Sequence, residues 1–460
     1  MSYQTDVRWS SRFAFLMAAV GSAVGLANIY RFPYTAGVSG GGAFVLIYLG
    51  AVVLLALPLV IAELTIGRRG KAAPPQAIRA VAAESGLSSN WGWMGVILGG
   101  FGGMLALSFY AVVGGWTMAF TFELATGALG GASAEKASQL FAELNARPLV
   151  LLGWFTAFVA ATIFISARGI RAGVEKAVKL MMPALLLILV AMVFYAMGVG
   201  DFDRAVRFLF TPDFSKVDAN VVLAAAGQAF FSVSVGMTAL VAYGAYIRRT
   251  TSISQSAAII VAVDTVVALL AGLAIFPIIF AFGVEADAGP GLVFITLPIV
   301  FAGMPGGAVF GTLFFTLLLF AALTSSIGMI EAAVAWLAER TRLGRTGAAI
   351  AVGCVSWSLG VLAALSFNLL ADVYPLGGIP IFAGKTFFDL FDFIVVNLMM
   401  PIGGILVAVF AGWLMKRQYS LDELYGGRPT PGYTAWRFLV RYLAPLVLVG
   451  IFVDMLRQAI

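Results

Sequence analysis

The dominant pattern in the sequence is a series of long apolar blocks separated by short polar segments. The stretch between Arg31 and Glu63 holds 31 uncharged residues, and residues 91–122 hold another 32. Because about 20 apolar residues are enough for a helix to cross a bilayer, blocks of this length predict membrane-spanning helices. We expect eleven of them, at residues 12–35, 41–67, 91–122, 148–167, 173–200, 219–247, 252–283, 308–338, 346–371, 387–415 and 436–458.

The composition agrees with a membrane protein and excludes a soluble enzyme. Apolar residues make up 61% of the chain and charged residues only 11%, against about 25% charged in a soluble domain. No histidine is present, which removes imidazole metal sites, histidine triads and histidine proton relays. The chain also has no Walker A lysine motif, no metal-ligand cluster and no nucleophile–base pair. We therefore expect neither an enzyme nor an ATP-driven pump.

The positive charges predict which way the chain is threaded. With the N terminus in the cytoplasm, 20 of the 28 Lys and Arg residues fall on the cytoplasmic side, and the C terminus is external. The net charge of +6 therefore reflects topology, and no nucleic-acid partner is expected. The predicted segments are a cytoplasmic N terminus (1–11), helices 1–5 (12–200), an external loop (201–218), helices 6–10 (219–415, with an external hairpin at 284–307), a cytoplasmic loop (416–435) and helix 11 (436–460).

The eleventh span is the most charged of the set. Only Tyr442–Val453 is free of charge, between Arg441 and Asp454. We expect the Arg441 side chain to extend toward the cytoplasmic surface and Asp454 toward the external one.

Two of the predicted spans are interrupted at their centre. The first contains glycine, serine and asparagine within residues 21–28, and the sixth has the same character at residues 228–238. Close helix packing is the alternative explanation, since Gly21 and Gly25 form a small-xxx-small face. The two segments are five spans apart, however, so their helices run in opposite directions. Matching breaks in oppositely oriented helices are typical of inverted-repeat transporters, whose substrate and ion sites lie at the midplane.

Several ordered motifs resemble the neurotransmitter:sodium symporter family over nearly the whole chain. They are Trp9-Ser10-Ser11-Arg12, Val24-Gly25-Leu26-Ala27-Asn28-Ile29-Tyr30-Arg31-Phe32-Pro33, Gly40-Gly41-Gly42-Ala43-Phe44, Gln228-Ala229-Phe230-Phe231-Ser232-Val233-Ser234 and Leu323-Thr324-Ser325-Ser326. The resemblance implies an all-α integral membrane protein with 11 transmembrane helices, built as a 5+5 inverted repeat with discontinuous helices 1 and 6. As in bacterial members, we expect it in the inner membrane.

The resemblance also implies two sodium sites built from oxygen ligands, which hard cations prefer. The first would use the backbone of Ala23, the side chains of Asn28, Ser232 and Asp264, and the carboxylate of the substrate. The second would use the backbones of Gly21, Val24 and Ala321 with the hydroxyls of Thr324 and Ser325. Taken alone, the Thr-Ser-Ser run is also compatible with ordinary helix–helix hydrogen bonding.

Asp264 departs from many relatives of this family and is alone in an apolar helix. Those relatives carry asparagine there with a serine one turn later that helps to hold chloride, whereas this chain has Asp264 and then Ala268. A lone carboxylate within a span needs a partner, a proton or a cation. We expect the carboxylate to supply the negative charge that chloride supplies elsewhere, so that transport needs sodium and no chloride.

The pocket implied by the resemblance is lined by apolar and small side chains. Its residues are Ser22, Ala23, Leu26, Ala27, Ala106, Tyr110, Phe231, Ser232, Ser234, Met237, Ser325, Gly328 and Met329. The side-chain end carries no charge, so a neutral apolar or aromatic group fits and a charged one would have no partner. The first sodium, backbone amides near Leu26 and the Tyr110 hydroxyl would hold the carboxylate end. An amino acid is therefore favoured over a biogenic amine.

Gates at both ends follow from the same resemblance. Arg31 and Asp392 would close the outer side above Phe231, with Asp389 as an alternative to Asp392. Tyr246 and Glu339 would act on the inner side, with Arg8 as the basic partner because Asp6 occupies the usual basic position. Glu63 either braces the break in the sixth helix or pairs with Arg68 or Arg69.

These observations predict a sodium-coupled symporter of neutral hydrophobic or aromatic L-amino acids that works by alternating access. Two alternatives remain at this point: a proton-coupled symporter in which Asp264 titrates, and a non-transporting amino-acid sensor. The expected partners are a neutral L-amino acid, two sodium ions and the lipid bilayer. The sequence indicates no oligomeric state.

Overall fold

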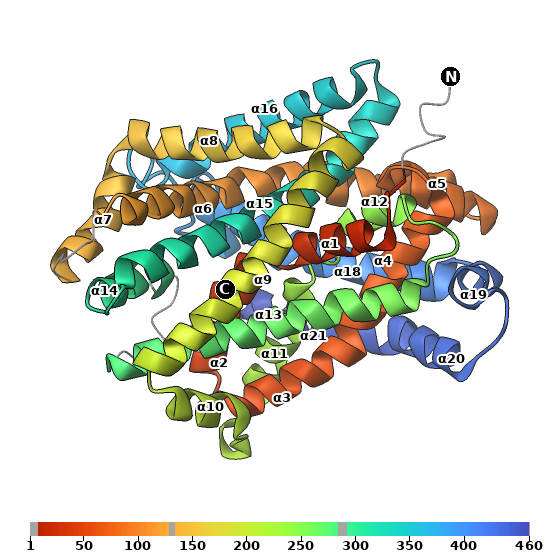
Figure 1. Ribbon diagram of the computed structural model, residues 1–460. Helices are drawn as coiled ribbons and strands as arrows, with labels where there is room; N and C mark the ends of the chain where they lie inside the picture. The colour runs from red at the N-terminus through yellow and green to blue at the C-terminus, as the bar shows by residue number, and fades with distance from the viewer. Residues whose placement is uncertain (1–7, 128–133, 284–291, 460) are drawn as a thin grey trace.

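The protein is a bundle of long helices lying roughly side by side (Figure 1). The computed structural model describes residues 8–127, 134–283 and 292–459, and this part of the chain contains only helices and turns. Nine helices there are long and apolar enough to span a membrane, and a tenth span is made by two helices bent by 56° at a short break. The sixth predicted span is also broken, into two helices that are each too short to span alone.

The first five spans are formed by the following elements, where η marks 3-10 and π turns. Span 1 is α1 (Arg12–Ala23), η1 (Ala27–Arg31) and α2 (Phe32–Val38), and span 2 is α3 (Gly42–Ala51), η2 (Val52–Ala56) and α4 (Leu57–Gly70). After α5 (Pro74–Glu84) and η3 (Ser89–Gly92), span 3 is η4 (Gly95–Phe101) and α6 (Gly102–Ala125). After α7 (Ala134–Ala146), span 4 is α8 (Pro148–Ala167), and span 5 is η5 (Ile170–Glu175) and α9 (Lys176–Val199).

The remaining six spans follow two short surface elements, α10 (Phe202–Phe210) and η6 (Phe214–Lys216). Span 6 is α11 (Ala219–Ser232) and α12 (Ala239–Ala245), and span 7 is α13 (Ile253–Ala281). After η7 (Leu292–Thr296) and α14 (Leu297–Ala302), span 8 is α15 (Gly307–Arg340). Span 9 is α16 (Gly344–Leu365), followed by η8 (Pro380–Phe382). Span 10 is α17 (Phe387–Asp392), η9 (Phe393–Met399), α18 (Met400–Val409) and η10 (Phe410–Leu414). After α19 (Arg417–Tyr425), span 11 is α20 (Pro431–Phe438), η11 (Leu439–Leu443) and α21 (Ala444–Ala459).

Several boundaries differ from the sequence-based expectation by a few residues, and span 11 begins five residues earlier, at Pro431 instead of 436. The ninth span ends at Leu365, six residues before the predicted 371, where Ser366 and Asn368 make tertiary contacts. The Ser366 hydroxyl accepts from the Phe388 amide, and the Asn368 side chain donates to the Asn145 carbonyl. In the predicted hairpin 284–307, residues 284–291 lie outside the described part, and the remainder forms η7, α14 and the start of α15.

Span 6 packs on span 2 with both of its halves, α11 against α3 and α12 against α4. Glycines permit the close approach of α12. A Cβ atom added at Gly244 would lie 2.9 Å from the Leu64 carbonyl oxygen, and one added at Gly67 would overlap the Val241 carbonyl. The broken span is therefore held at van der Waals distance to an intact one.

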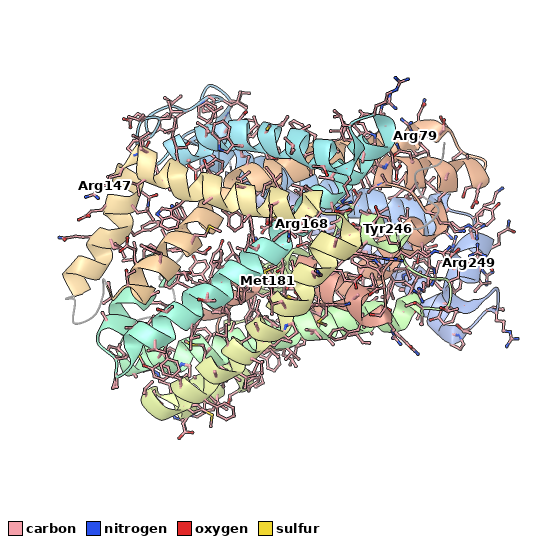
Figure 2. All side chains as sticks on the ribbon, turned by 45° about the horizontal axis from the view of Figure 1, so that its top comes forward. Arg79, Arg147, Arg168, Met181, Tyr246 and Arg249 are labelled. Carbon is pink, nitrogen blue, oxygen red and sulfur yellow. The ribbon has the colours of Figure 1, made fainter. Side chains whose placement is uncertain are left out.

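The two ends of the bundle are distinct. The "Trp9 end" carries Trp9, α5, α12, α19 and α20, and lies to the right in Figure 1. The "Arg31 end" carries Arg31, α7, α10 and α14 at the opposite side. In Figure 2, Arg79, Tyr246 and Arg249 lie toward the Trp9 end, far from Arg147.

Candidate functional site

The two broken spans face each other and are joined by direct hydrogen bonds. The Gln228 side-chain amide of α11 donates to the Ala27 carbonyl at 3.1 Å, just after the break in span 1, and this carbonyl also accepts from the Phe32 amide. The Asn28 amide donates to the Ser232 hydroxyl at 2.7 Å. Segments about 200 residues apart in the sequence therefore form one polar centre within the apolar bundle.

The break in span 6 has a distorted backbone that one buried acid supports. Ser234, Gly236 and Thr238 have φ angles of 52°, 95° and 55°, a region that residues with side chains seldom adopt. The fully buried Glu63 carboxylate accepts a hydrogen bond from the Gly236 amide at 2.7 Å. Of the two roles predicted for Glu63, the structure therefore favours bracing.

The basic residues proposed as alternative partners of Glu63 are engaged elsewhere. Arg68 pairs with Glu423 of α19 at 2.7 Å, and Arg69 pairs with Glu84 at 2.8 Å and Asp422 at 3.0 Å. The bonds to Glu423 and Asp422 connect the end of span 2 to the segment between spans 10 and 11, and the bond to Glu84 connects it to α5.

Three of the four residues predicted for the first sodium site are in contact. The Asn28 amide donates to an Asp264 carboxylate oxygen at 2.9 Å, and the Ser232 hydroxyl donates to the other carboxylate oxygen. Asp264 is completely buried, and no Lys or Arg of the described residues forms an ion pair with it. The fourth, Ala23, is 3% exposed at the end of α1, which packs against α13.

Tyr48 of span 2 belongs to the same centre, although the sequence analysis did not include it. Its ring is fully buried, and its hydroxyl has no hydrogen-bond partner among the described residues. It interacts electrostatically with Asp264 and lies near Ser232 and Thr265. The signal that could have found it is a tyrosine placed inside a span rather than at its end.

The residues predicted for the second sodium site also come together. The Ser325 hydroxyl donates to the Val24 carbonyl at 3.0 Å and lies 3.5 Å from the Gly21 carbonyl. The Thr324 hydroxyl donates to the Ala321 carbonyl at 3.1 Å, and a Cβ atom added at Gly21 would lie 3.1 Å from Thr324 Cβ. The Ser325 hydroxyl of α15 thus meets carbonyls of span 1 at its break, whereas the Thr324 hydroxyl bonds to a carbonyl of its own helix.

Gly25 lies beside residues of both predicted sodium sites and of the predicted pocket. Its amide donates to the Asn28 side-chain oxygen at 3.0 Å. A Cβ atom added there would lie 2.7 Å from the Ser325 hydroxyl and 3.4 Å from the Tyr110 hydroxyl. That Tyr110 hydroxyl is buried and has no hydrogen-bond partner among the described residues. Since buried polar groups are rarely left unpaired, it is available to a ligand.

Several of the remaining predicted pocket residues make close contacts. Gly328 lies so close to Ser22 that a Cβ atom added at Gly328 would overlap the Ser22 hydroxyl. A Cβ atom added at Gly103 would likewise overlap the Met329 carbonyl. A Cβ atom at Gly102 would lie 2.6 Å from the terminal methyl groups of both Met237 and Met399. The predicted pocket residues other than Gly328 are all buried or half-buried: Ser22, Ala23, Leu26, Ala27, Ala106, Tyr110, Phe231, Ser232, Ser234, Met237, Ser325 and Met329.

At the Arg31 end, the predicted gate residues are neighbours without a direct ion pair. The Arg31 guanidinium stacks over the Phe231 ring at 4.7 Å from the centroid. Asp392 interacts electrostatically with Arg31, but no oxygen of this described residue approaches an Arg31 nitrogen within 4.0 Å. Asp389 instead forms a capping box with Thr386 at the start of α17, which leaves Asp392 as the acid facing Arg31.

At the Trp9 end, the N-terminal segment is fixed against spans 5 and 6. The Trp9 indole donates to the Tyr243 carbonyl at 3.2 Å, and its ring packs edge-on against Tyr243 and Tyr246. The Ser10 amide and hydroxyl both donate to the Glu175 carboxylate, which also pairs with Lys179 at 2.6 Å. Tyr246 therefore lies where an inner gate is expected.

The structure does not bring Arg8 to Glu339. Arg8 is exposed, its carbonyl accepts from the Arg171 side chain, and within the described residues it has no ion pair with Glu339. Glu339 accepts a hydrogen bond from the Ala73 amide at 2.8 Å. Asp6 lies outside the described residues.

A buried ion pair that the sequence analysis missed lies at this end. Glu331 of α15 is fully buried and binds Arg345 through two nitrogen–oxygen contacts of 2.9 and 2.7 Å. Arg345 also donates to the Ser166 carbonyl, so the pair joins spans 4, 8 and 9. Like Asp264, Glu331 is a carboxylate within an apolar span, and that signal could have identified it.

This arrangement offers oxygen ligands to cations and a hydroxyl to an organic anion. Buried oxygens come together at two points, and the Tyr110 hydroxyl, which has no hydrogen-bond partner among the described residues, lies beside Gly25. Closed, aromatic-rich contacts lie on both sides of this centre. Such a centre is suited to a ligand that enters from one end and leaves by the other.

Comparisons with known proteins agree with this geometry. The family model described as "Sodium:neurotransmitter symporter family" matches residues 7–143 and 149–459. An uncharacterized sodium-dependent transporter of Bacillus subtilis, YhdH, is 36% identical over 99% of each chain, and one from Haemophilus influenzae is 33% identical over 97% of each. The crystal structure of MhsT in complex with L-phenylalanine superposes with a TM-score of 0.85 at 36% identity, covering 98% of this chain and 100% of that one.

Proposed function

The chain belongs to the sodium:neurotransmitter symporter family, and from that premise we propose that it couples two sodium ions to the uptake of a neutral hydrophobic or aromatic L-amino acid. It is a sodium-dependent symporter of the membrane and not an enzyme, because the family consists of transporters. The observation that carries the finer proposal is the centre at Gly25, where two oxygen clusters flank one unpaired Tyr110 hydroxyl.

Asp264 supports the first sodium site in this proposal. A buried carboxylate whose contacts are all neutral is costly, and a sodium ion beside it would offset that cost. The ion would displace hydrogen bonds, because the Asn28 amide nitrogen now points at Ser232 and Asp264. Turning this amide would present its oxygen to the ion and release the Gly25 amide for the substrate carboxylate.

Coupling between sodium and substrate would follow from their shared position. The substrate carboxylate would complete the oxygen set around the first ion, so each would bind more tightly in the presence of the other. The second ion would bind Ser325, Thr324 and the carbonyls of Gly21, Val24 and Ala321, bracing the break in span 1 against α15. Gly25 touches Ser325 and Asn28 together, which links the two ions.

We propose that chloride is not required. The Asp264 carboxylate lies against Ser232 and Asn28 and supplies a fixed negative charge beside the first sodium. Ala268, one turn later on α13, offers no group that could hold an anion. The test is uptake in chloride-free gluconate medium, and a fall to background would refute this part of the proposal.

The substrate class follows from the lining of the side-chain end. Ala106, Phe231, Met237 and Met329 are apolar, and Met237 meets Met399 across Gly102. Flexible methionines adapt to side chains of different shape, aromatic rings included. MhsT, the structural neighbour, was crystallised with L-phenylalanine, which favours an aromatic or large aliphatic group here.

The gates support alternating access with a defined orientation. We propose that the Trp9 end faces the cytoplasm, since most Lys and Arg residues lie on that side, and that the protein lies in a bacterial inner membrane. Arg31, Phe231 and Asp392 would then close the outer side. Trp9, Tyr246 and Glu339 would close the inner side, aided by the Glu331–Arg345 pair.

The deciding experiment is equilibrium binding of tritiated leucine, phenylalanine and tryptophan to the purified protein, with sodium replaced by potassium at fixed pH. We expect binding only with sodium, and no displacement by dopamine or serotonin. A Tyr110→Phe variant should lose amino-acid affinity, because it removes only the unpaired hydroxyl. Strong displacement by an amine, or an unchanged affinity in Tyr110→Phe, would contradict the assigned substrate geometry.

A proton-coupled symporter is the second candidate, and the burial of Asp264 is the observation that favours it. A fully buried carboxylate without a basic partner can be neutralised by a proton as well as by a cation. In that case binding would follow pH and ignore the exchange of sodium for potassium, so the same experiment separates the two.

A further inference from the structure

Arg441 lies inside an apolar span and has no acidic partner among the described residues. It lies in η11, within the span 431–457, and its guanidinium is 3.8 Å from the centroid of the Trp413 ring and 5.5 Å from that of Tyr442. Its Nε is buried, and no hydrogen-bond acceptor or carboxylate among the described residues contacts it. An arginine in a spanning helix that finds no acid in the described part of the chain is available to an anion from outside the protein.

Two further arginines continue from Arg441 toward the surface. Arg437, one turn earlier, donates to the Tyr433 hydroxyl at 3.1 Å, and the Arg417 guanidinium lies 5.9 Å from the centroid of the Tyr433 ring. We name Arg417, Arg437 and Arg441 the basic strip. In the described part of the chain, none of the three forms an ion pair. Like charges one helical turn apart repel, and an anion shared between them would remove that repulsion.

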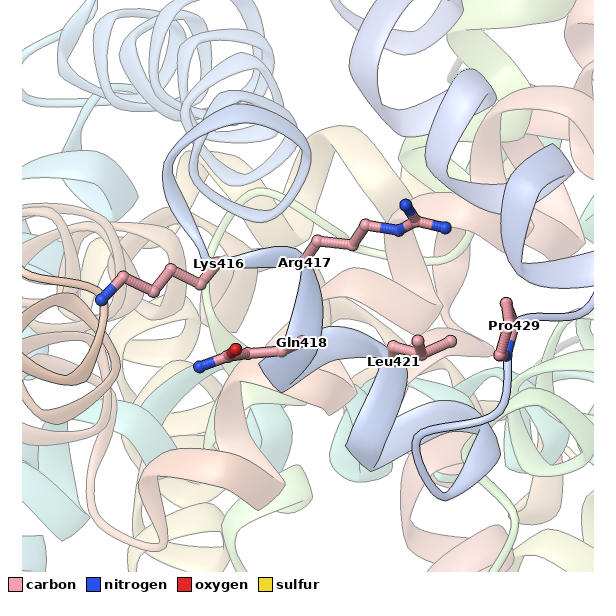
Figure 3. Close-up of a pocket in the computed structure, with 5 residues that line it drawn as sticks. All are labelled: Lys416, Arg417, Gln418, Leu421 and Pro429. Carbon is pink, nitrogen blue, oxygen red and sulfur yellow. The ribbon is translucent and has the colours of Figure 1, made fainter.

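The acids that could have neutralised the basic strip are committed to other partners. Asp422 and Glu423 of α19 bind Arg69 and Arg68 at the end of span 2. At the start of α19, an open groove of about 570 Å³ is lined by Lys416, Arg417, Gln418, Leu421 and Pro429, without a carboxylate. Figure 3 shows Lys416 and Arg417 extending in opposite directions, with Arg417 on the side of Leu421 and Pro429.

The surface beside the strip has the character of a membrane interface. Trp413, Phe438 and Tyr442 are 48%, 58% and 49% exposed, and the Trp413 indole donates to the Arg441 carbonyl at 2.9 Å. Exposed tryptophan and tyrosine at one level of a spanning helix mark the region of the lipid head groups. The rings therefore place Arg441 near the depth at which phosphates of the bilayer lie.

We propose that the basic strip binds the phosphate of an anionic phospholipid in the leaflet at the Trp9 end. Arginine binds phosphate oxygens through paired N–H groups, and basic pockets between spanning helices suit anionic head groups. A lipid is favoured over a free phosphate because the exposed rings beside Arg441 can cover its acyl chains. A zwitterionic choline lipid fits less well, since the ring faces that could hold its ammonium are occupied by Arg441.

The test is native mass spectrometry of the full-length protein in detergent, titrated with phosphatidylglycerol, phosphatidylcholine or inorganic phosphate. We expect a first phosphatidylglycerol molecule to bind in preference to phosphatidylcholine. Arg441→Gln should weaken that binding about fivefold, the factor expected for one basic residue at an anionic surface. The matched control is Arg168→Gln, which removes a guanidinium stacked on the exposed Phe164 ring at another face and should leave binding unchanged.

A second variant keeps the test valid if Arg441→Gln does not fold. Arg417 is exposed, so Arg417→Gln should preserve the fold and still weaken phosphatidylglycerol binding several-fold. Equal binding of the two lipids, an equal effect of Arg168→Gln, or displacement of the lipid by millimolar inorganic phosphate would each overturn the proposal. The last of these would identify the strip as a site for free anions.

Discussion

Replacing Gly25 with alanine is the sharpest test of the geometry between the two ion centres. The added Cβ would lie 2.7 Å from the Ser325 hydroxyl, whereas real Cβ contacts essentially never fall below 3.0 Å. Ser325 therefore has to rotate, and in doing so it leaves the Val24 carbonyl that it now contacts at 3.0 Å. The Tyr110 hydroxyl, at 3.4 Å, is in ordinary contact and need not move.

The size of the effect follows from this overlap. Overpacking by one methyl group in a close-packed site costs about 1–3 kcal/mol. If this overlap makes the binding free energy of the second ion less favourable by the same amount, the affinity for that ion falls by about 5- to 150-fold, at about 1.4 kcal/mol for each factor of ten. Amino-acid affinity at saturating sodium should change much less, because sodium in excess restores the occupied site.

The assay is a sodium titration of tritiated amino-acid binding to purified protein, with thermal melting measured in parallel. Gly50→Ala is the matched control, because no described atom outside its own stretch of helix lies within 4 Å of the Cβ that it adds. We expect Gly25→Ala to shift the sodium titration and Gly50→Ala to leave it in place. An unchanged sodium dependence in Gly25→Ala, or equal shifts in both variants, would refute the placement of Ser325 beside Gly25 as part of an ion site.

Three further predictions address the charged groups. Asp264→Asn should weaken sodium binding by up to about 1,000-fold, since unit charges about 4 Å apart interact by about 4 kcal/mol at an effective dielectric constant of 20, and added chloride should not restore it because Ala268 offers no group to hold an anion; the sodium titration of amino-acid binding measures the effect, with the exposed Asp372→Asn as the control. Glu63→Ala should lower the free energy of unfolding by about 1–3 kcal/mol and weaken amino-acid binding, because the Gly236 amide loses its acceptor. Glu63→Gln keeps an acceptor and should destabilise the protein less. Equal destabilisation by the two variants in thermal melting would contradict the bracing role. Glu331→Gln should lower the free energy of unfolding by about 3–5 kcal/mol by leaving Arg345 without its carboxylate. Glu143→Gln, in the exposed pair with Arg147, should lower it by less than about 1 kcal/mol. Similar shifts of the melting temperature in the two variants would show that burial does not govern the strength of these pairs.

The parts of the site that could be predicted are those with a local anomaly in the sequence. Glycine, serine and asparagine at residues 21–28, in the middle of an apolar span, conflict with an ordinary helix, and the chain breaks there. A lone carboxylate at Asp264 in an apolar helix likewise predicted a polar cluster, which the structure shows with Asn28 and Ser232. In both cases the cost of a polar group in an apolar surrounding is visible without coordinates.

The parts that could not be predicted depend on pairing between distant segments. Arg345 follows α15 in the chain and looks like one of several cytoplasmic arginines, yet it turns back to Glu331. Arg8 was expected to meet Glu339, but its segment is fixed instead by Ser10 on Glu175 and by Arg171 on the Arg8 carbonyl. The π turns of spans 2, 3, 10 and 11 were also unforeseen, because sequences such as Val52–Ala56 contain nothing that distinguishes them from α-helix.

The burial of Trp9 also gives the protein an optical reporter of its own. Its indole is 2% exposed and lies with ring centroids 5.5 and 6.4 Å from Tyr243 and Tyr246, in an apolar and tyrosine-rich surrounding. If the Trp9 end opens as proposed, the indole would leave these rings and meet water, so its emission would move to longer wavelength and energy transfer from the two tyrosines would fall. The difference in emission between the wild type and Trp9→Phe therefore isolates this residue from the other eight tryptophans and can follow opening of this end in real time, without an attached dye.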